Sequence, residues 1–516
     1  MGILKELEKS KDTARGVKGD DMLGKSNSAT GEILGASVEA DKQRYKVDAE
    51  SRSESNGEVG YGHSSEEVPK MRVWSEGSLV SRSLETKGRD RMNAKKAQTM
   101  LEEARLRKLE YKLYVAARMN PKRRFGVLYD HMCDLRMLRV AWKRVKANRG
   151  TSGIDGESIE QVISNGEEEF LKGIQKSLKD GTYCPKPVKR VYIPKANGKK
   201  RPLGIPALRD RVVQMVCKLV IEPLFEADFC TCSYGFRPGR SNQEAVKTVW
   251  KAVNRQKWIV DVDLQGYFDT INHDLLMREV KKRVSDPKVL RLIWLWLKAG
   301  IMEEGKLRTS ELGTPQGGVL SPLLSNIFLH VIDKQWENIC GVKLVRFADD
   351  MVLLCTSEKQ AGFVLQRLKG QLEKQKLILN EEKTRVVHVK ESFDFLGFTF
   401  REGYSRQRRQ EVRIAYPKTK SVEKFQKNLK DACKVFQLGG ELGDLIDNLN
   451  RKLKGWINYF KIGTSYKQVL KVTEFACQQL RIFLRRRTCS KATRGYERWP
   501  NRYFYERGLI YGPSLL

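Results

Sequence analysis

Apolar and polar positions alternate along the middle of the chain in patterns that predict specific elements. An apolar, β-branched run begins at Trp258, and a second run at residues 343–355 indicates two short buried strands joined by a tight turn. Between them, residues 323–332 place apolar side chains on one helical face. Ser321 is the expected N-cap of that helix, with Pro322 at its first position.

The two ends of the chain differ in pattern. A basic helical pattern runs over residues 97–118, and three further helical stretches are expected at 421–437, 441–461 and 466–487. The first hundred residues are rich in Ser, Gly, Glu, Lys and Asp with few clustered apolar residues, which is typical of a disordered segment. They contain no signal-peptide pattern, and no apolar run is long enough to span a membrane.

Aspartates interrupt the predicted strands at two places. Asp349 and Asp350 lie inside the second apolar run, and Asp261, Asp263 and Asp269 lie in or just after the first strand. Carboxylates are rarely buried unless they are paired or bound to a cation. A strand-end carboxylate and another in a neighbouring hairpin could hold two Mg²⁺ ions for phosphoryl transfer. The alternative is an Asp-rich hairpin turn beside an ordinary strand end.

A glycine-containing loop precedes the predicted helix. Residues 315–318 read Pro-Gln-Gly-Gly, a turn that lets the backbone approach a ligand closely. Gln316 is therefore a candidate binding residue. The alternative is an ordinary loop that feeds a core helix.

These pieces, in this order, resemble the palm of reverse transcriptases, and in particular the group II intron-encoded proteins that combine a reverse transcriptase with a maturase. The resemblance covers roughly four fifths of the chain, from about Pro121 to the C-terminus. The matching segments read RPLGIPALRDRVVQMV, YGFRPGRSNQEAV, QGGVLSP, FADD, FDFLGFTF and GWINYF.

The resemblance implies roles for the acidic residues. Asp263 matches the first metal ligand of the family, Asp349 matches the second, and Asp350 matches the third acidic position. Asp261 and Asp269 are then expected to be a strand-edge carboxylate and a helix or turn cap. The implied cofactor is Mg²⁺, as two ions.

The resemblance also implies a nucleotide pocket. Its expected residues are Lys195, Arg201, Phe268, Gln316 and Gly317. Phe268 would lie against C2′ of the incoming nucleotide and exclude a 2′-hydroxyl, with core packing as the alternative. Asn197-Gly198 is a hairpin signal that would put the basic residues Lys195 and Arg201 on a β-ribbon, where they would meet the triphosphate.

Charge independently indicates a nucleic-acid partner. The chain has 97 Lys and Arg against 63 Asp and Glu, a net charge of +34, which suits phosphate backbones. Residues 1–100 hold 18 basic and 17 acidic side chains, whereas residues 451–516 hold 15 and 3, interleaved with aromatic residues. Basic and aromatic residues together are typical of binding to structured RNA or single strands.

RNA-binding candidates in that region are Arg451, Lys454, Trp456 and Tyr459. Trp456 stands at helical spacing from Tyr459 and Phe460, so core packing and an RNA platform are equally plausible for it.

The implied fold class is α+β: right-hand polymerase fingers and palm, with helices packed on an antiparallel sheet, followed by an α-helical thumb or domain X. We expect five parts. They are a low-complexity tail and basic helix (1–115), an N-terminal RNA-binding extension (116–173), reverse transcriptase fingers and palm (174–400), the thumb or maturase domain X (401–487) and a basic DNA-binding tail (488–516).

The positions of cysteine and histidine bear on the redox compartment and on the expected domains. The ten cysteines are scattered without a C-x-x-C motif, which indicates free thiols in a reducing compartment. Some relatives carry an HNH endonuclease with paired Cys and His ligands. The last residues of the sequence, YFYERGLIYGPSLL, lack such a pattern, so we expect no endonuclease domain.

The expected function is RNA-directed DNA synthesis joined to splicing assistance and retromobility of an intron. The expected partners are intron RNA, an RNA template, a DNA primer or target and dNTPs, with no membrane and a homodimer left open. The expected location is the bacterial cytoplasm, with nucleoid association during action on DNA. The alternatives are a reverse transcriptase of another role, retron-like or CRISPR-linked, and a splicing-only maturase with an inactive palm.

Overall fold

The structure is a computed structural model. It describes residues 90–194, 198, 200–303, 306–308, 312–313, 317–405, 409–488 and 495–516, with no side-chain description for 90–96, 201 and 306–308. Of the first hundred residues, for which disorder was predicted, residues 1–89 lie outside the described residues, as do Lys195 and Gln316. For residues 90–100 the prediction is wrong, because a helix begins at Asp90 and continues without a break into the predicted basic helix.

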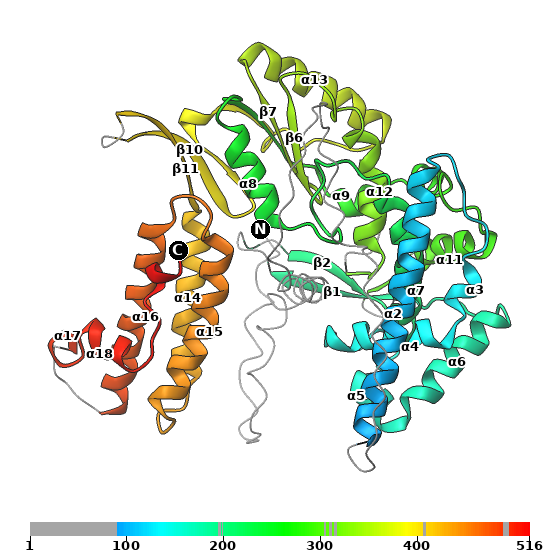
Figure 1. The fold of residues 1–516 in the computed structure, drawn as a ribbon, viewed down its shortest axis with the longest axis horizontal. Coiled ribbons are helices and arrows are strands. Elements are labelled where there is room, and N and C mark those ends of the chain that lie inside the picture. The colour runs from blue at the N-terminus through cyan, green and yellow to red at the C-terminus, as the bar shows by residue number, and fades with distance from the viewer. Residues whose placement is uncertain are drawn as a thin grey trace, which may run out of the picture.

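The first described elements are helices that pack on the centre of the molecule. They are α2 (Asp90–Met119), α3 (Tyr129–Met132), α4 (Leu135–Ala147), α5 (Ile159–Asn165) and α6 (Glu167–Lys179). The Asp134 side chain caps α4 by accepting a hydrogen bond from the amide of Arg136, and Leu138, Ala141 and Trp142 are buried on one side of the helix. Helix α2, predicted at 97–118, packs against α4 and α7 (Leu208–Glu226) (Figure 1).

A mixed sheet follows this helical region. Its strand order is β2-β1-β4-β5, with bounds β1 (Val188–Pro194), β2 (Lys200–Ile205), β4 (Ile301–Glu303) and β5 (Lys306–Arg308). Strands β1 and β2 pair antiparallel up to Pro194 and Lys200, which confirms the predicted β-ribbon. Lys195 and Asn197, in the turn that joins the strands, lie outside the described residues.

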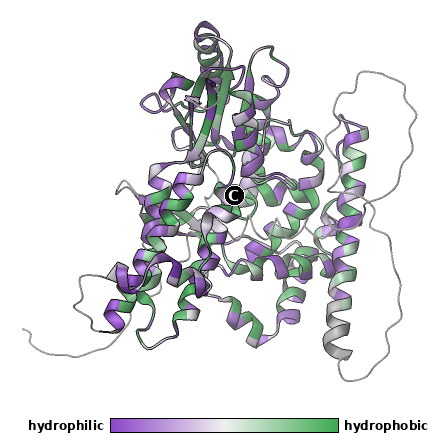
Figure 2. Ribbon diagram, turned by 60° about the vertical axis from the view of Figure 1, so that its left-hand side comes forward, coloured by the Kyte–Doolittle hydropathy of each residue, from purple (hydrophilic) through white to green (hydrophobic). Residues whose placement is uncertain are grey.

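The second sheet is fully antiparallel and contains both predicted aspartate segments. Its order is β6-β7-β3-β8, with bounds β3 (Trp258–Val262), β6 (Lys343–Phe347), β7 (Asp350–Cys355) and β8 (Arg385–His388). The helices near it in sequence are α8 (Asn242–Ala252), α9 (Tyr267–Thr270), α10 (His273–Val280), α11 (Pro287–Lys298), α12 (Ser321–Asp333) and α13 (Glu358–Lys374). Its strands are largely hydrophobic (Figure 2), as their apolar runs predicted.

The predicted N-cap of α12 is wrong by one residue. Ser321 is the first helical residue and Leu320 precedes it, with no side-chain cap. The amide of Ser321 already donates a hydrogen bond to the carbonyl oxygen of Gly318, 3.3 Å away, because the glycine turn feeds directly into the helix.

The C-terminal part is a hairpin sheet and a helical bundle, at the left of Figure 1. The sheet order is β11-β10-β9, with bounds β9 (Phe393–Phe395), β10 (Phe398–Ser405) and β11 (Gln410–Pro417). The helices are α14 (Thr419–Val435), α15 (Leu442–Phe460), α16 (Tyr466–Arg487), α17 (Gly495–Arg498) and α18 (Asn501–Glu506). The three long helices begin and end within two residues of the predicted stretches.

Three apolar clusters hold these parts together. One joins the N-terminal helices to the antiparallel sheet, a second fills the C-terminal bundle, and a third joins the back of the sheet to β9, β10 and Phe460. The α+β prediction, with an antiparallel sheet followed by a helical region, is confirmed. The described helices are all too short or too polar to cross a membrane, and the nine described cysteines are free thiols.

The packing of α2 yields a first prediction. Deleting residues 1–95 should leave the melting temperature nearly unchanged, because the described apolar core begins at Leu106. Deleting 1–119 also removes Leu106, Leu113 and Ala117 from that core. Because truncating one buried Leu costs about 2–5 kcal/mol, this longer deletion should lower the melting temperature strongly or prevent soluble expression. An equal loss in both truncations would show that residues 1–95 pack on the body.

Candidate functional site

Strand pairing places the aspartates of the two segments side by side. Strand β3 lies between β7 and β8, and its last pair with β7 joins Val262 to Met351. Asp263 and Asp350 are the next positions of these two strands, so they lie beside each other at the end of the sheet. Phe347 pairs with Asp350 across β6 and β7, which leaves Ala348 and Asp349 as the two-residue turn.

The strand bodies are buried but this end of the sheet is open. Val260 and Val352 are inaccessible to solvent, whereas Asp349 is half-buried and Asp350 is exposed. The negative charge of each aspartate raises the pKa of a nearby tyrosine, in addition to the effect of burial. Burial is the main cause that raises the pKa of Tyr267, and Asp349 raises it further. Burial likewise raises the pKa of Tyr459 to about 12, with a further contribution from Asp350.

A loop after α13 fixes the position of Asp263. The amide of Asn380 donates a 2.8 Å hydrogen bond to the carbonyl oxygen of Asp263, and Lys383 Nζ lies 2.9 Å from Asp263 Oδ2. The Asp263 side chain is 38% exposed and that of Lys383 is 64% exposed, so a diffusing cation can reach this carboxylate. Sequence reasoning missed Lys383, because nothing in its local pattern links it to a residue 120 positions earlier.

Asp261 and Asp269 occupy different surroundings. Arg385 Nε lies 3.3 Å from Asp261 Oδ2, and burial raises the pKa of Asp261 despite that neighbouring charge. Asp269 is exposed on α9, and its amide donates a hydrogen bond to the carbonyl oxygen of Gly266. The structure thus separates both residues in environment from the carboxylates at the sheet end.

The donor atoms at the sheet end suit a hard cation. Asp263, Asp349 and Asp350 offer carboxylate oxygens, the ligands that Mg²⁺ prefers. Within the described part of the chain, no three His, Cys, Asp or Glu side chains converge into a ready-made metal cage. This is compatible with Mg²⁺, which is usually bound by one or two carboxylates and completes its shell with waters and substrate phosphates.

Phe268 lies on α9 directly after Tyr267, the phenol whose pKa is raised in part by Asp349. It is half-buried against the core, with its ring edge-to-face on Tyr267 at 5.1 Å between centroids. Tyr267 is itself buried and donates a 3.0 Å hydrogen bond from its hydroxyl to the carbonyl oxygen of Ser325 in α12. Phe268 therefore has one packed side and one accessible side, so its predicted contact with a sugar remains a prediction.

Two described glycines before α12 lie close to α9 and to the first sheet. Gly313 has φ +88°, and a Cβ there would lie 2.7 Å from the carbonyl oxygen of Phe268. Gly317 has φ +109°, and a Cβ there would lie 2.8 Å from the carbonyl oxygen of Gly204 in β2. Only glycine tolerates both the conformation and the close approach. Gln214 Oε1 then accepts a hydrogen bond from the amide of Val319 at 3.1 Å, which anchors the end of the loop.

The other predicted nucleotide-binding residues are only partly described. Arg201 belongs to β2 and its backbone pairs with Ile193, but its side chain lies outside the description. Lys195 and Gln316 also lie outside it. Their roles remain predictions.

The predicted RNA-binding residues divide into two kinds. The Trp456 ring stacks on Phe425 at 5.0 Å and packs against Phe460, and the Tyr459 hydroxyl donates a 3.0 Å hydrogen bond to the carbonyl oxygen of Leu396. Both rings therefore pack α15 against neighbouring elements. For Trp456, core packing was one of the two alternatives left open by the sequence. Arg451 and Lys454 are exposed on the same helix.

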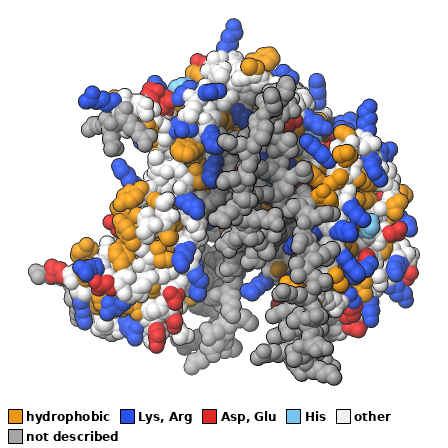
Figure 3. All heavy atoms as spheres, viewed as in Figure 1, with side chains coloured by type: hydrophobic (Ala, Val, Ile, Leu, Met, Phe, Trp, Pro, Cys, Tyr) orange, Lys and Arg blue, Asp and Glu red, His pale blue; other side chains and the backbone are white. Residues whose placement is uncertain are grey.

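Basic side chains are scattered over the visible surface among apolar, neutral and some acidic ones (Figure 3). Figure 3 shows Lys and Arg over the C-terminal helices on one side and over the N-terminal half on the other. This distribution suits a polyanion that contacts both parts.

Sequence reasoning also missed Arg346, which lies within the apolar run of β6. Its side chain and that of its ion-pair partner, Asp333, are both 0% exposed. A charged residue inside a buried strand requires a partner, so its position in the run was a usable signal.

Comparison with known families identifies two consecutive regions. The family described as reverse transcriptase (RNA-dependent DNA polymerase) matches residues 193–400. The family described as group II intron, maturase-specific domain matches residues 422–504. The first region includes the aspartate site, and the second includes most of the C-terminal helical bundle.

Individual relatives are similar over large parts of the chain. Protein YkfC of Escherichia coli (strain K12) is 35% identical over 375 residues, which are 65% of this chain and 98% of that protein. The group II intron-encoded protein LtrA of Lactococcus lactis subsp. cremoris is 37% identical over 269 residues, 51% of this chain and 44% of LtrA. The match thus spans less than half the length of LtrA.

A solved structure, a partial Cas6-RT-Cas1–Cas2 complex, is 25% identical with a TM-score of 0.31, covering 48% of this chain and 42% of that one. So low a TM-score supports no argument about the role of this chain.

The position of Phe268 leads to a second prediction. If its accessible side meets the nucleotide sugar, Phe268→Val should open space for a 2′-hydroxyl and raise the use of rNTPs relative to dNTPs. Competing incorporation of dTTP and UTP on poly(rA)/oligo(dT) measures this ratio. Tyr267→Phe is the matched control, because it alters the neighbouring ring without opening space. Unchanged discrimination in Phe268→Val would assign Phe268 to core packing alone.

Proposed function

Because the chain belongs to the reverse transcriptase family that carries a group II intron maturase domain, we propose that it is an RNA-directed DNA polymerase that also binds its intron RNA and assists splicing. The observation that carries the polymerase role is the meeting of Asp263 with the Asp349-Asp350 turn at the open end of the antiparallel sheet.

Each residue of the site would have a different role in the reaction. When bound, Mg²⁺ held by Asp263 and Asp349 would stabilise the attacking and leaving oxygens of an in-line phosphoryl transfer. Asp350, exposed beside them, would add negative charge to the same site. The packed edge of Phe268 keeps its ring in place, so that the ring would exclude a 2′-hydroxyl from the bound nucleotide.

The surrounding loops would shape the pocket. Gly317 lies against β2, the strand that carries Arg201, and Gly313 lies against α9, which follows β3. We propose that Arg201 and Lys195 bind the triphosphate from this hairpin and that Gln316 and Gly317 line the nucleotide side.

The splicing role would use a different surface. The maturase match runs from within α14 to within α18. In α15, Arg451 and Lys454 are exposed, while Trp456 and Tyr459 are half-buried and pack against neighbouring elements. We propose that Arg451 and Lys454 bind intron RNA and that the two rings hold α15 in position for them. The RNA performs the splicing chemistry, and the protein supplies binding energy.

The third prediction tests the metal ligands. Asp263→Asn or Asp349→Asn preserves shape but removes a charged ligand, so primer extension on poly(rA)/oligo(dT) should fall by several orders of magnitude. Splicing assistance should survive, since the ribozyme binds its own metals. Asp269→Asn, an exposed change nearby, should retain extension. Near-wild-type extension in either ligand variant would reject that ligand. If even the wild-type protein fails to extend while it assists splicing, the chain is a splicing-only maturase.

The fourth prediction separates the two activities. Replacing Arg451 and Lys454 together with Ala should weaken intron binding and splicing at low Mg²⁺ while largely sparing poly(rA)/oligo(dT) extension. The salt dependence of binding should also become shallower, by about 0.7 in the log–log slope for each single-strand phosphate that the variant no longer neutralises.

The matched control for this pair is Lys427→Ala with Lys430→Ala, which removes the same charge from exposed positions of α14. This control should affect splicing less. If splicing and extension fall together in the Arg451 and Lys454 variant, this surface holds any template duplex and the proposed intron-specific role is wrong.

A further inference from the structure

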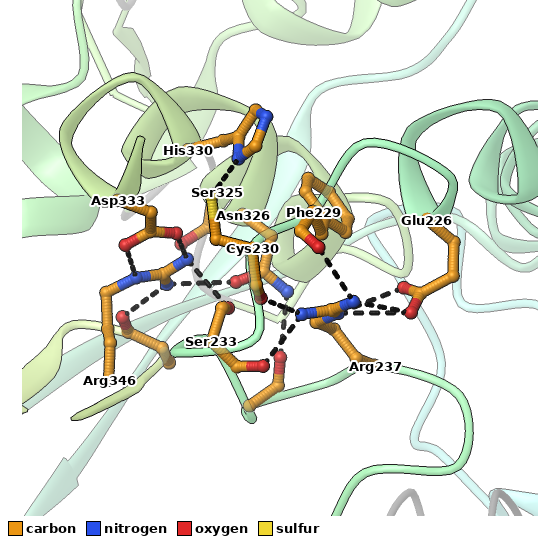
Figure 4. A network of polar contacts seen from close by, with 12 residues as sticks. Glu226, Phe229, Cys230, Ser233, Arg237, Ser325, Asn326, His330, Asp333 and Arg346 are labelled. Atoms are coloured by element: carbon orange, nitrogen blue, oxygen red, sulfur yellow. Dashed lines mark hydrogen bonds and ion pairs between the residues drawn. The ribbon is translucent and has the colours of Figure 1, made fainter. Parts of the chain in front are cut away.

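The aspartate turn rests on a buried guanidinium whose five N–H donors are all occupied (Figure 4). Arg346 contacts Asp333 through Nε, 2.8 Å from Oδ1, and again through one terminal nitrogen. The same terminal nitrogen donates to Ser233 Oγ at 2.8 Å. The other terminal nitrogen donates to Asn326 Oδ1 at 3.0 Å and to the carbonyl oxygen of Ala348 at 2.8 Å.

The bond to Ala348 holds the turn itself. Ala348 has φ +56°, a left-handed conformation that residues with a Cβ rarely adopt and that needs support from its surroundings. Its carbonyl group precedes Asp349 directly, so a hydrogen bond at that oxygen fixes the orientation of the peptide that carries Asp349. Arg346 lies two residues earlier on β6 and supplies this bond from inside the core.

The same guanidinium joins two further segments to the turn. Asn326 and Asp333 lie on α12, and Asn326 Nδ2 also donates a 2.8 Å hydrogen bond to the carbonyl oxygen of Gly235. The backbone of Arg346 accepts a hydrogen bond from the amide of Tyr234 and donates one to the carbonyl oxygen of Cys232, each at 2.9 Å. Segment 232–235 therefore runs beside β6, with an isolated parallel bridge between Ser233 and Arg346.

Segment 232–235 touches the turn directly. A Cβ at Gly235 would collide with the backbone nitrogen of Ala348, so glycine is required for this approach. A second buried guanidinium, that of Arg237, fixes the segment from its other end. It pairs with Glu226 and donates hydrogen bonds to the carbonyl oxygens of Cys230 and Ser233, at 2.7 and 2.8 Å (Figure 4).

Stability alone does not require an ion pair at this place. A buried ion pair gains little over well-packed apolar residues of the same volume, because desolvation of both charges offsets their attraction. An apolar pair would fill the space, but it could not bind the carbonyl oxygen of Ala348. Arg346 adds directional bonds to three segments that meet at the aspartates.

We infer that Arg346 is a positioning residue for catalysis, which fixes the Ala348-Asp349 turn so that Asp349 faces Asp263. The inference rests on the proposed polymerase function and adds a residue that touches neither substrate nor metal. Its loss should lower the rate of the chemical step while nucleotide binding, through other residues, changes little.

The test uses two variants of the full-length protein. The double variant Arg346→Met with Asp333→Leu removes both charges together, so no buried charge is left unpaired and folding should be retained. Arg346→Lys keeps the charge, but a compact ammonium cannot reach Asp333, Asn326, Ser233 and Ala348 at once. The readouts are the melting temperature and the kcat and KM for dTTP on poly(rA)/oligo(dT).

The matched control is Arg283→Lys. Arg283 is 2% exposed, pairs with Asp228, which is 22% exposed, and donates hydrogen bonds to the carbonyl oxygens of Ala117, Asn120 and Arg123. The change therefore disturbs the network of another buried guanidinium, one that binds the N-terminal helical region instead of the aspartate turn. We expect kcat to fall about 100-fold in both Arg346 variants, as for a misplacement near 1 Å, with KM changed less than about threefold. The control should keep its kcat.

The outcomes distinguish failure of the proposed polymerase function from failure of the positioning role of Arg346. Wild-type protein without extension activity would overturn the proposed function. Active wild-type protein together with folded Arg346 variants of normal kcat would overturn the positioning role alone. Loss of folding in both Arg346 variants, with Arg283→Lys folded, would also overturn it and assign Arg346 to folding.

Discussion

The register between β3 and β7 is the constraint on which the site depends. It places Val262 opposite Met351, and therefore Asp263 beside Asp350. Because side chains alternate along a strand, a slip of one residue would turn Asp263 to the opposite face of the sheet. The apolar residues on both strands resist such a slip, since it would also move them out of the core. The hydrophobic core thus fixes the position of the carboxylates.

The buried hydrogen bonds of Arg346 orient the turn residues that strand pairing does not hold. Pairing ends at Asp350, and the two turn residues before it, Ala348 and Asp349, have no strand partner to orient them. Arg346 reaches this turn from within the core, and Asp333 on α12 neutralises the charge that this requires. The aspartate turn and α12 are therefore parts of one unit, whereas the C-terminal bundle has a core of its own.

Much of this arrangement could be predicted, because it depends on local pattern. The apolar runs predicted β3, β6 and β7, and helical periodicity predicted the three long C-terminal helices. The order of the motifs identified the family. What could not be predicted depends on contacts between distant residues: Lys383 beside Asp263, and the packing of Trp456 on Phe425. Arg346 was visible as a charge in a buried strand, but only the fold shows that its bonds end at the aspartate turn.

The most direct measurement is a crystal structure of the full-length protein with an RNA/DNA primer–template, a dNTP and Mn²⁺. The anomalous signal of Mn²⁺ would locate the metal independently of any assumption about its ligands. Our account predicts metal between Asp263 and Asp349, the triphosphate beside it, and Lys383 displaced from the Asp263 carboxylate. Metal and nucleotide bound elsewhere, with Lys383 still paired to Asp263, would contradict it.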